Sequence, residues 1–208
     1  MIHDITPPIT ASLNVFPGDT PPSREVLLDM SNGDALTLST LRATVHLGAH
    51  ADAPSHYGVT GRPIDQQGLD YYIGTCQVIH APAARATRVE PADLTAPIQA
   101  PRVLLATGTY PNPERWNPDF AALSPPLVDH LHDHGVITVG VDTPSVDPAD
   151  AKVLTTHHRF LTHDMAIIEG LVLTDVPDGL YELIALPLKL AGFDASPVRA
   201  ILRDRAEV

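Results

Sequence analysis

The chain has 208 residues, of which 44% are hydrophobic and 18% charged, and its formal net charge is −12. This length and composition predict a globular protein with a sizeable hydrophobic core and argue against intrinsic disorder. The negative charge, with no cluster of Lys and Arg, argues against partners that present phosphate groups, so we expect neither nucleic-acid nor membrane binding.

Cys76 is the only cysteine. The chain therefore forms no internal disulfide and no thiolate-rich zinc site, so any metal must be held by imidazole and carboxylate groups. The first residues show neither a basic segment followed by an apolar run nor a long apolar stretch. We expect no signal peptide, no membrane span and a cytoplasmic location. We find no internal repeat or long linker, and expect a single domain over residues 1–208.

Short apolar runs bounded by turn residues dominate the chain. Proline-rich residues 1–22 predict an extended arm or loop over the body of the protein. Strand-like stretches follow at 24–30, 36–46, 75–80, 102–106 and 136–141, with further apolar stretches at 165–172 and 181–186. Short helices are predicted over 125–134, where Gly135 ends the helix, and over 197–203. Because strands outnumber helices, we predict an α/β fold with a mixed, partly antiparallel sheet rolled towards a barrel and few helices.

The segment His46-Leu-Gly-Ala-His50-Ala-Asp52-Ala-Pro-Ser-His56 carries four chemically active groups in eleven residues. Its glycine and proline argue against a regular helix, so we expect a strand end that runs into a loop. In an extended chain His50 and Asp52 point to the same side. Two imidazoles and one carboxylate make three ligands, which is typical of a catalytic metal site with an open position for water. The remaining histidine, His56, is a candidate general base or acid.

A second metal would need ligands from elsewhere, and Asp52 has a second oxygen with which to bridge to it. Glu169 lies in an otherwise apolar stretch, where a carboxylate is costly unless it is paired or bound to a metal. The sequence alone leaves a salt bridge at Glu169 equally open. The candidates in this region are His157, His158, His163 and Glu169. The histidine-rich residues 129–134 offer no third ligand on one helical face, so we interpret them as a solvated helix end.

The 46–56 segment resembles the H-x-G-T-H-x-D-x-P-x-H signature of the cyclase-like metal hydrolases, and the whole chain most resembles the bacterial kynurenine formamidases (arylformamidases). The narrower resemblance rests on residues 15–19, 140–148, 166–173 and 181–190. It implies a swivelling β/β/α fold and a homodimer with sites near the interface. The implied activity is hydrolysis of N-formyl-L-kynurenine to L-kynurenine and formate in tryptophan degradation, by a metal-bridged hydroxide.

The resemblance also implies roles for single residues. It implies two zinc ions per chain, with manganese or another divalent metal as alternatives. The implied ligands are His46, His50 and Asp52 for the first ion, and Asp52, His157 and Glu169 for the second. His56 matches the group that donates and accepts protons. Phe16 lies where the family usually has a tryptophan lining the substrate pocket, and Ala49 replaces the family's threonine, which leaves the breadth of the substrate range open.

Two other functions stay open at this point. The first is a single-metal hydrolase of cyclic amides such as isatin, although the presence of both His157 and Glu169 argues against it. The second is a metal-binding module without catalytic activity. In that module His56 would be the fourth ligand of a closed structural site.

Overall fold

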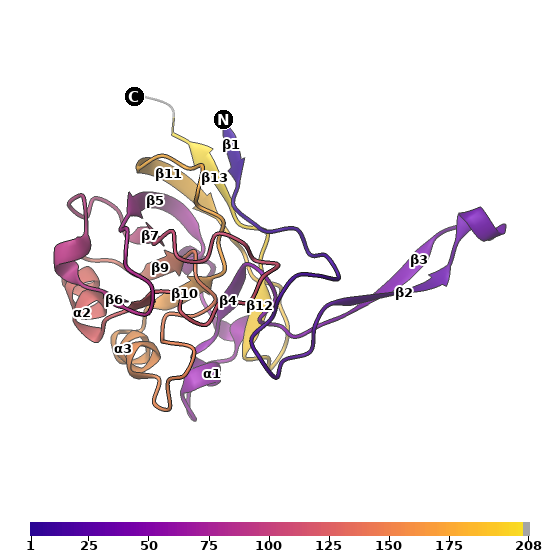
Figure 1. Cartoon of the computed structure of the whole chain (residues 1–208), viewed down its shortest axis with the longest axis horizontal. Coiled ribbons are helices and arrows are strands. Elements are labelled where there is room, and N and C mark those ends of the chain that lie inside the picture. Colours follow the sequence, from indigo (N-terminus) through magenta and orange to yellow (C-terminus); the bar gives the residue numbers. More distant parts are fainter. Residues whose placement is uncertain (206–208) are drawn as a thin grey trace.

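The computed structural model describes residues 1–205, and nine of their strands form one sheet in the order β1-β13-β11-β5-β7-β9-β10-β4-β12. The bounds are β1 Ile2–Asp4, β4 His50–Asp52, β5 Ile73–His80, β7 Arg102–Ala106, β9 Thr138–Val141, β10 Ala166–Glu169, β11 Gly179–Ile184, β12 Ala195–Pro197 and β13 Ile201–Asp204. Strands β5, β7, β9 and β10 run parallel, and the strands on both flanks pair antiparallel. The sheet curls into an open half-barrel (Figure 1), which confirms the predicted fold class.

Helices are few among the described residues. They are α1 Pro54–Tyr57, α2 Pro125–Asp133 and α3 Thr155–His163, with 3₁₀ turns η1 Met30–Asn32, η2 Ile64–Gln66, η3 Leu69–Tyr71 and η4 Pro91–Asp93. Two further strands, β6 Arg88–Val89 and β8 Ala122–Leu123, pair with each other. Within residues 1–205 every helix is too short or too polar to cross a membrane.

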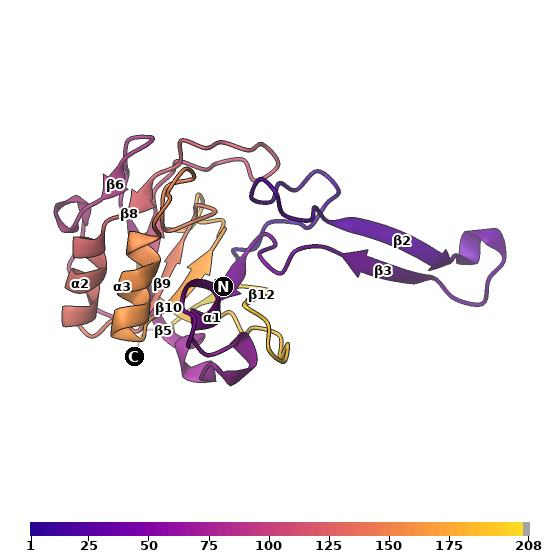
Figure 2. The same cartoon turned by 90° about the horizontal axis from the view of Figure 1, so that it is seen from below.

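Helices α2 and α3 lie side by side on one face of the sheet (Figure 2), and the core has a layer on each face. Successive strand side chains alternate between the faces, so Leu104 packs inside the curl while Val103 and Leu105 pack towards the helices. Helix α2 forms as predicted: the Ser124 side chain accepts a hydrogen bond from the Leu127 amide at its start. Cys76 is buried in the inner layer.

The predicted helix over 197–203 is wrong. Residues 195–197 and 201–204 instead form β12, which pairs with β4, and β13, which lies between β1 and β11. These strands are three and four residues long, and their partners are remote in sequence, so pairing rather than local propensity decides their conformation. Helix α3 was not predicted, because its sequence TTHHRFLTH has few apolar residues; Phe160 is its buried anchor.

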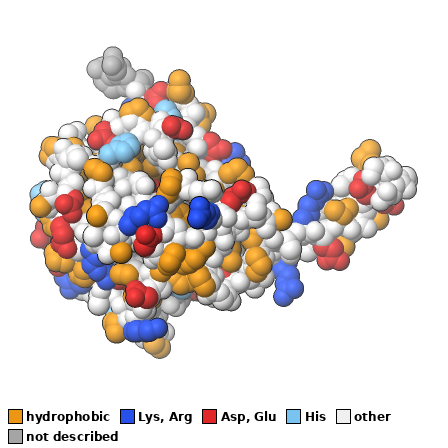
Figure 3. Space-filling model, viewed as in Figure 1, with side chains coloured by type: hydrophobic (Ala, Val, Ile, Leu, Met, Phe, Trp, Pro, Cys, Tyr) orange, Lys and Arg blue, Asp and Glu red, His pale blue; other side chains and the backbone are white. Residues whose placement is uncertain are grey.

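A two-stranded hairpin, β2 Ser23–Leu28 with β3 Leu38–Arg42, projects far from the body (Figures 1 and 2). Every residue of both strands is exposed. Figure 3 shows hydrophobic side chains among the charged ones along its length. The exposed large apolar residues are Val26, Leu27, Leu28, Met30, Leu36, Leu38 and Leu41. The strand predicted over 36–46 is shorter than expected and covers only Leu38–Arg42. After Arg42 the chain leaves the hairpin, and its next residues line the cavity described below.

Candidate metal centre

The antiparallel pairing of β4 with β10 builds the floor of the candidate site. Its register sets Glu169 opposite His50 and Ile167 opposite Asp52. His50 and Asp52 lie two residues apart on one strand and turn their side chains to the same side, as predicted. His46 comes from the segment before β4, and His157 from the first turn of α3.

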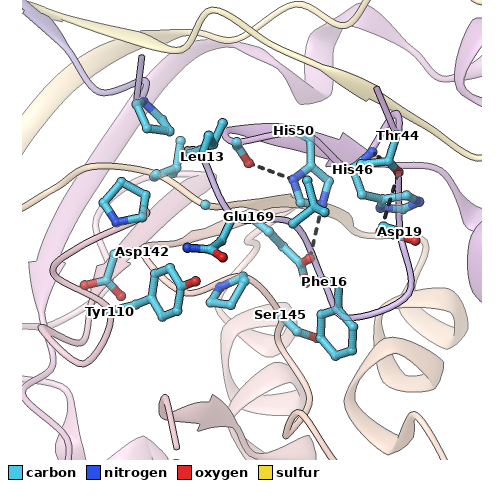
Figure 4. A pocket seen from close by; sticks show the side chains of 18 of the residues that line it. Leu13, Phe16, Asp19, Thr44, His46, His50, Tyr110, Asp142, Ser145 and Glu169 are labelled. Atoms are coloured by element: carbon cyan, nitrogen blue, oxygen red, sulfur yellow. Dashed lines mark hydrogen bonds and ion pairs between the residues drawn. The ribbon is translucent and has the colours of Figure 1, made fainter. Parts of the chain in front are cut away.

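Asp52 lies in the middle of this cluster, and its two oxygens face different histidines. Oδ1 lies 3.1 Å from His46 Nδ1 and 3.5 Å from His50 Nε2. Oδ2 lies 3.5 Å from His157 Nε2, which is in turn 3.7 Å from Glu169 Oε1. The second Glu169 oxygen is 3.4 Å from His50 Nε2 (Figure 4). The structure therefore brings together all five residues that were predicted as ligands, with Asp52 between the three histidines.

The donor set fits a divalent metal. Asp52 is fully buried, and neither of its oxygens has a hydrogen-bond partner. A buried carboxylate without hydrogen bonds is costly unless a cation compensates it. Two ligand atoms on one tetrahedral zinc ion lie about 3.4 Å apart, close to the spacings around Asp52. Imidazole and carboxylate groups at these spacings are suitable ligands for zinc or another divalent metal.

Each of the three histidines has one ring nitrogen held from outside the cluster. The Nδ1 of His50 lies 2.9 Å from the Gly48 carbonyl oxygen, and the Nε2 of His46 lies 3.0 Å from the Asp194 carboxylate. With an N–H donating to these oxygens, the other ring nitrogen is left free and faces Asp52. Such contacts fix the tautomer and the direction of a ligating ring.

Asp147 holds the third of these rings, that of His157. The buried Asp147 carboxylate accepts from His157 Nδ1 at 2.9 Å and from the backbone amides of His157 and Thr156 at the start of α3. Arg88 donates to its other oxygen at 3.2 Å. Although burial by itself raises the pKa of Asp147, the hydrogen bonds from His157 and Thr156 hold this pKa well below the usual range. Asp147 thus anchors the helix and aims His157 Nε2 at Asp52.

Replacing Asp147 with Asn tests this orienting role. We expect metal affinity to fall about 10- to 100-fold, because an amide is a poorer acceptor for His157 than a carboxylate. The measurement is zinc titration of chelator-treated protein. Asp150→Asn, which changes an exposed carboxylate outside the pocket, is the matched control. Equal zinc affinity in both variants would assign Asp147 to helix capping alone.

His56 lies on α1 at the edge of the cluster. Its side chain is 33% exposed, and its Nδ1 is 3.5 Å from the Asp194 carboxylate. One nitrogen of His56 lies within 4.8 Å of ligand atoms of His46 and Asp52, so geometry alone allows either proton transfer or ligation. Of the other candidates, His158 is exposed and His163 pairs with Asp129, away from Asp52.

The cluster opens into a cavity of about 500 Å³ (Figure 4). Phe16 lines it, together with Tyr110 and Trp116. Carboxylates also line the cavity, whereas no Lys or Arg does so among residues 1–205. These carboxylates belong to Asp19, Asp142, Glu169 and Asp194. The cavity thus pairs an aromatic wall with an acidic, histidine-rich one.

Without metal, the clustered carboxylates change the acidity of the histidines. Burial alone would lower the pKa of His46 and of His157. For His46 the nearby Asp52 and Asp194 outweigh burial and raise the pKa to about 9. For His157 the carboxylates Asp147 and Asp52 raise it to about 10. The metal-free cluster therefore holds protons that a metal must displace.

These pKa values predict that a rise in pH destabilises the metal-free protein but strengthens zinc binding. Both histidines have raised pKa values in the fold, so their stabilising contribution is complete below the unfolded pKa of about 6.5 and is lost as pH rises through about 9 to 10. Over this window we expect the melting temperature of chelator-treated protein to fall and zinc affinity to rise. Thermal denaturation and zinc titration across the window measure both. A melting temperature that rises together with zinc affinity would contradict the assignment.

Comparison with known proteins agrees with this geometry. The family model Cyclase (“Putative cyclase”) matches residues 3–148. A potential metal-dependent hydrolase with cyclase activity is 27% identical, with a TM-score of 0.86 and coverage of 100% of this chain and 99% of that one. A predicted metal-dependent hydrolase from Bacillus stearothermophilus is 28% identical, with a TM-score of 0.83 and coverage of 99% and 98%.

A more distant structure, isatin hydrolase A from Labrenzia aggregata, shares the fold at 21% identity, with a TM-score of 0.81 and coverage of 97% and 93%. The curled mixed sheet and these relatives define the class as cyclase-like metal-dependent hydrolases. By the family model, which matches more than half of its length, the chain belongs to the Cyclase family.

Several residues of the site were not predicted from the sequence. Asp147 and Asp194 are single carboxylates in loops, and only the fold brings them next to His157 and His46. A usable signal existed for Asp147, since it lies within residues 140–148, which carried part of the resemblance. Trp116 lies in a proline-rich loop whose sequence gives no indication that it lines the cavity.

Proposed function

We propose that the protein is an arylformamidase that hydrolyses N-formyl-L-kynurenine to L-kynurenine and formate, using two zinc ions. The observation that carries the proposal is Asp52, a fully buried carboxylate whose unbonded oxygens face two separate sets of ligands. A carboxylate so placed is suited to bridge two metals. In this proposal His46, His50 and Asp52 hold the first ion, and Asp52, His157 and Glu169 hold the second.

Bound zinc would supply Lewis acidity and a water of lowered pKa. The chain's own residues supply the rest of the reaction. Water adds to the formyl carbon, the carbon–nitrogen bond breaks, and the departing aryl amine takes a proton. His56 is placed to move that proton, because it lies beside the cluster, is partly exposed and is held near Asp194.

The size and the lining of the cavity are consistent with an aromatic substrate. Its volume of about 500 Å³ is within the range of small-molecule pockets. Phe16 offers an aromatic surface for the aniline ring. Asp142 offers a carboxylate to the substrate's ammonium group. This carboxylate accepts hydrogen bonds from Thr107 and from the Gly108 backbone amide. No Lys or Arg of the described residues lines the cavity beside it.

Formate release by zinc-loaded protein tests the proposal. We expect hydrolysis of N-formyl-L-kynurenine to be much faster than hydrolysis of isatin. The reverse preference, with one manganese ion per chain, would favour a ring-opening hydrolase. Tightly bound metal without hydrolysis of either compound would favour a metal-binding module.

We also propose that the protein is a homodimer, and we assign the β2–β3 hairpin to the contact. An isolated two-stranded sheet is marginally stable in water, and this hairpin exposes seven large apolar side chains. The chain segments at its base, around Phe16 and Thr44, line the cavity, so a second copy seated on the hairpin would lie close to the site. Sedimentation velocity measures the mass in solution, and a monomer at micromolar concentration would contradict the assignment.

A further inference from the structure

Trp116 is the only tryptophan of the chain, and it lies in the wall of the cavity. Its ring meets that of Phe16 edge to face, with centroids 5.1 Å apart and planes at 74°. Tyr110 and Phe120 extend this aromatic contact at 6.3 Å and 6.2 Å. Phe120 is buried and supports Trp116 from the protein side, while Trp116 and Phe16 are half-buried. The result is a continuous aromatic wall that remains open to the cavity.

Specific contacts join the two segments that carry these rings. The hydroxyl groups of Thr10 and Ser12 both donate to the Glu114 carboxylate at 2.7 Å. The Asn14 amide donates to the Pro113 carbonyl at 3.0 Å. These bonds connect the N-terminal segment before Phe16 to the loop before Trp116. The spacing of the two rings is therefore set by the fold.

We infer that Trp116 is a specificity-determining residue, and that its ring, with Phe16, binds the aromatic ring of the substrate. The inference rests on the proposed hydrolysis of an aryl amide. The metal-ligand cluster lines the same cavity, so an aryl ring on this wall leaves the amide free to reach that cluster. Aromatic rings gain affinity from edge-to-face and stacked contacts that a saturated ring of similar size cannot make. The wall therefore selects aryl over alkyl amides.

Binding can be followed directly, because the emission of a single tryptophan reports on this wall alone. The test uses zinc-loaded protein and two unreactive compounds of matched shape, phenylurea and cyclohexylurea. We expect phenylurea to change Trp116 emission and to bind about 2- to 12-fold more tightly than cyclohexylurea. Equal affinities would overturn the inference. So would unchanged emission when equilibrium dialysis shows that phenylurea is bound.

Substitution separates ring binding from catalysis. Trp116→Leu should raise KM for N-formylaniline about 2- to 12-fold more than KM for N-formylcyclohexylamine, because leucine keeps an apolar contact but loses the aromatic one. Trp116→Phe should restore most of the difference. Equal effects on both formamides would overturn the inference. If neither these formamides nor N-formyl-L-kynurenine is hydrolysed, the proposed function fails, and the urea affinities of the wild type and Trp116→Leu then decide the role of Trp116.

Discussion

Asp52→Asn should abolish the binding of both metals and reduce formate release at least about 10³-fold, since a metal supplies several kcal/mol of transition-state stabilisation. Asn keeps the size of the side chain but removes its charge and one ligand oxygen. Because both oxygens of Asp52 face histidine nitrogens, one change should affect both halves of the site. Zinc content of the purified variant measures the effect on binding.

Two controls separate loss of metal from loss of fold. Asp150→Asn changes an exposed carboxylate outside the cavity and should retain zinc and activity. The Asp52→Asn protein should still unfold cooperatively, but added zinc should no longer raise its melting temperature. If this variant still binds two zinc ions per chain, Asp52 is not the bridging ligand.

His56→Ala should reduce kcat about 10²- to 10⁴-fold, the usual contribution of a general acid or base, while zinc content stays the same. His56 lies at the edge of the cluster, where it is partly exposed and near Asp194. Because it is not enclosed by carboxylates, we expect its loss to affect proton transfer rather than zinc binding. Steady-state kinetics and zinc analysis of the same preparation measure both effects. His158→Ala, an exposed histidine of α3, is the matched control.

The His56 variant also separates a catalytic site from a structural one. A structural zinc site is closed by four protein ligands, so loss of a fourth ligand would remove metal and stability together. Loss of zinc together with a lower melting temperature would therefore assign His56 to the metal. Retained zinc with full activity would instead remove His56 from the proton-transfer step.

The sequence predicted the part of the site that is local. His50 and Asp52 share a short strand, where alternation alone fixes that they point to one side. The approach of Glu169 depends on the pairing of β4 with β10, more than a hundred residues apart. The apolar surroundings of Glu169 made it a candidate ligand, and the resemblance assigned it to the second ion. No local pattern encodes the long-range register that sets it opposite His50.

The fold class followed from the many short apolar runs, whereas individual elements were less predictable. Helix α3 has one fully buried apolar anchor, Phe160, and depends on the carboxylate of Asp147, which lies in the preceding loop and accepts from the amides at the start of the helix. Residues 195–197 and 201–204 form strands because β4, β11 and β1 offer edges to them. The strands of the β2–β3 hairpin were foreseen, but their projection from the body has no sequence signal. For β12 and β13, contacts remote in sequence decide the outcome.

The most direct test of the proposed two-zinc hydrolase is a zinc titration of chelator-treated protein. Formate release from N-formyl-L-kynurenine is followed at each addition. The arrangement of His46, His50, His157 and Glu169 around Asp52 predicts that activity rises and levels off at about two zinc ions per chain, since each zinc takes about three protein ligands and these five residues share one carboxylate. Activity that levels off at one zinc ion, or no formate at any zinc concentration, would contradict it.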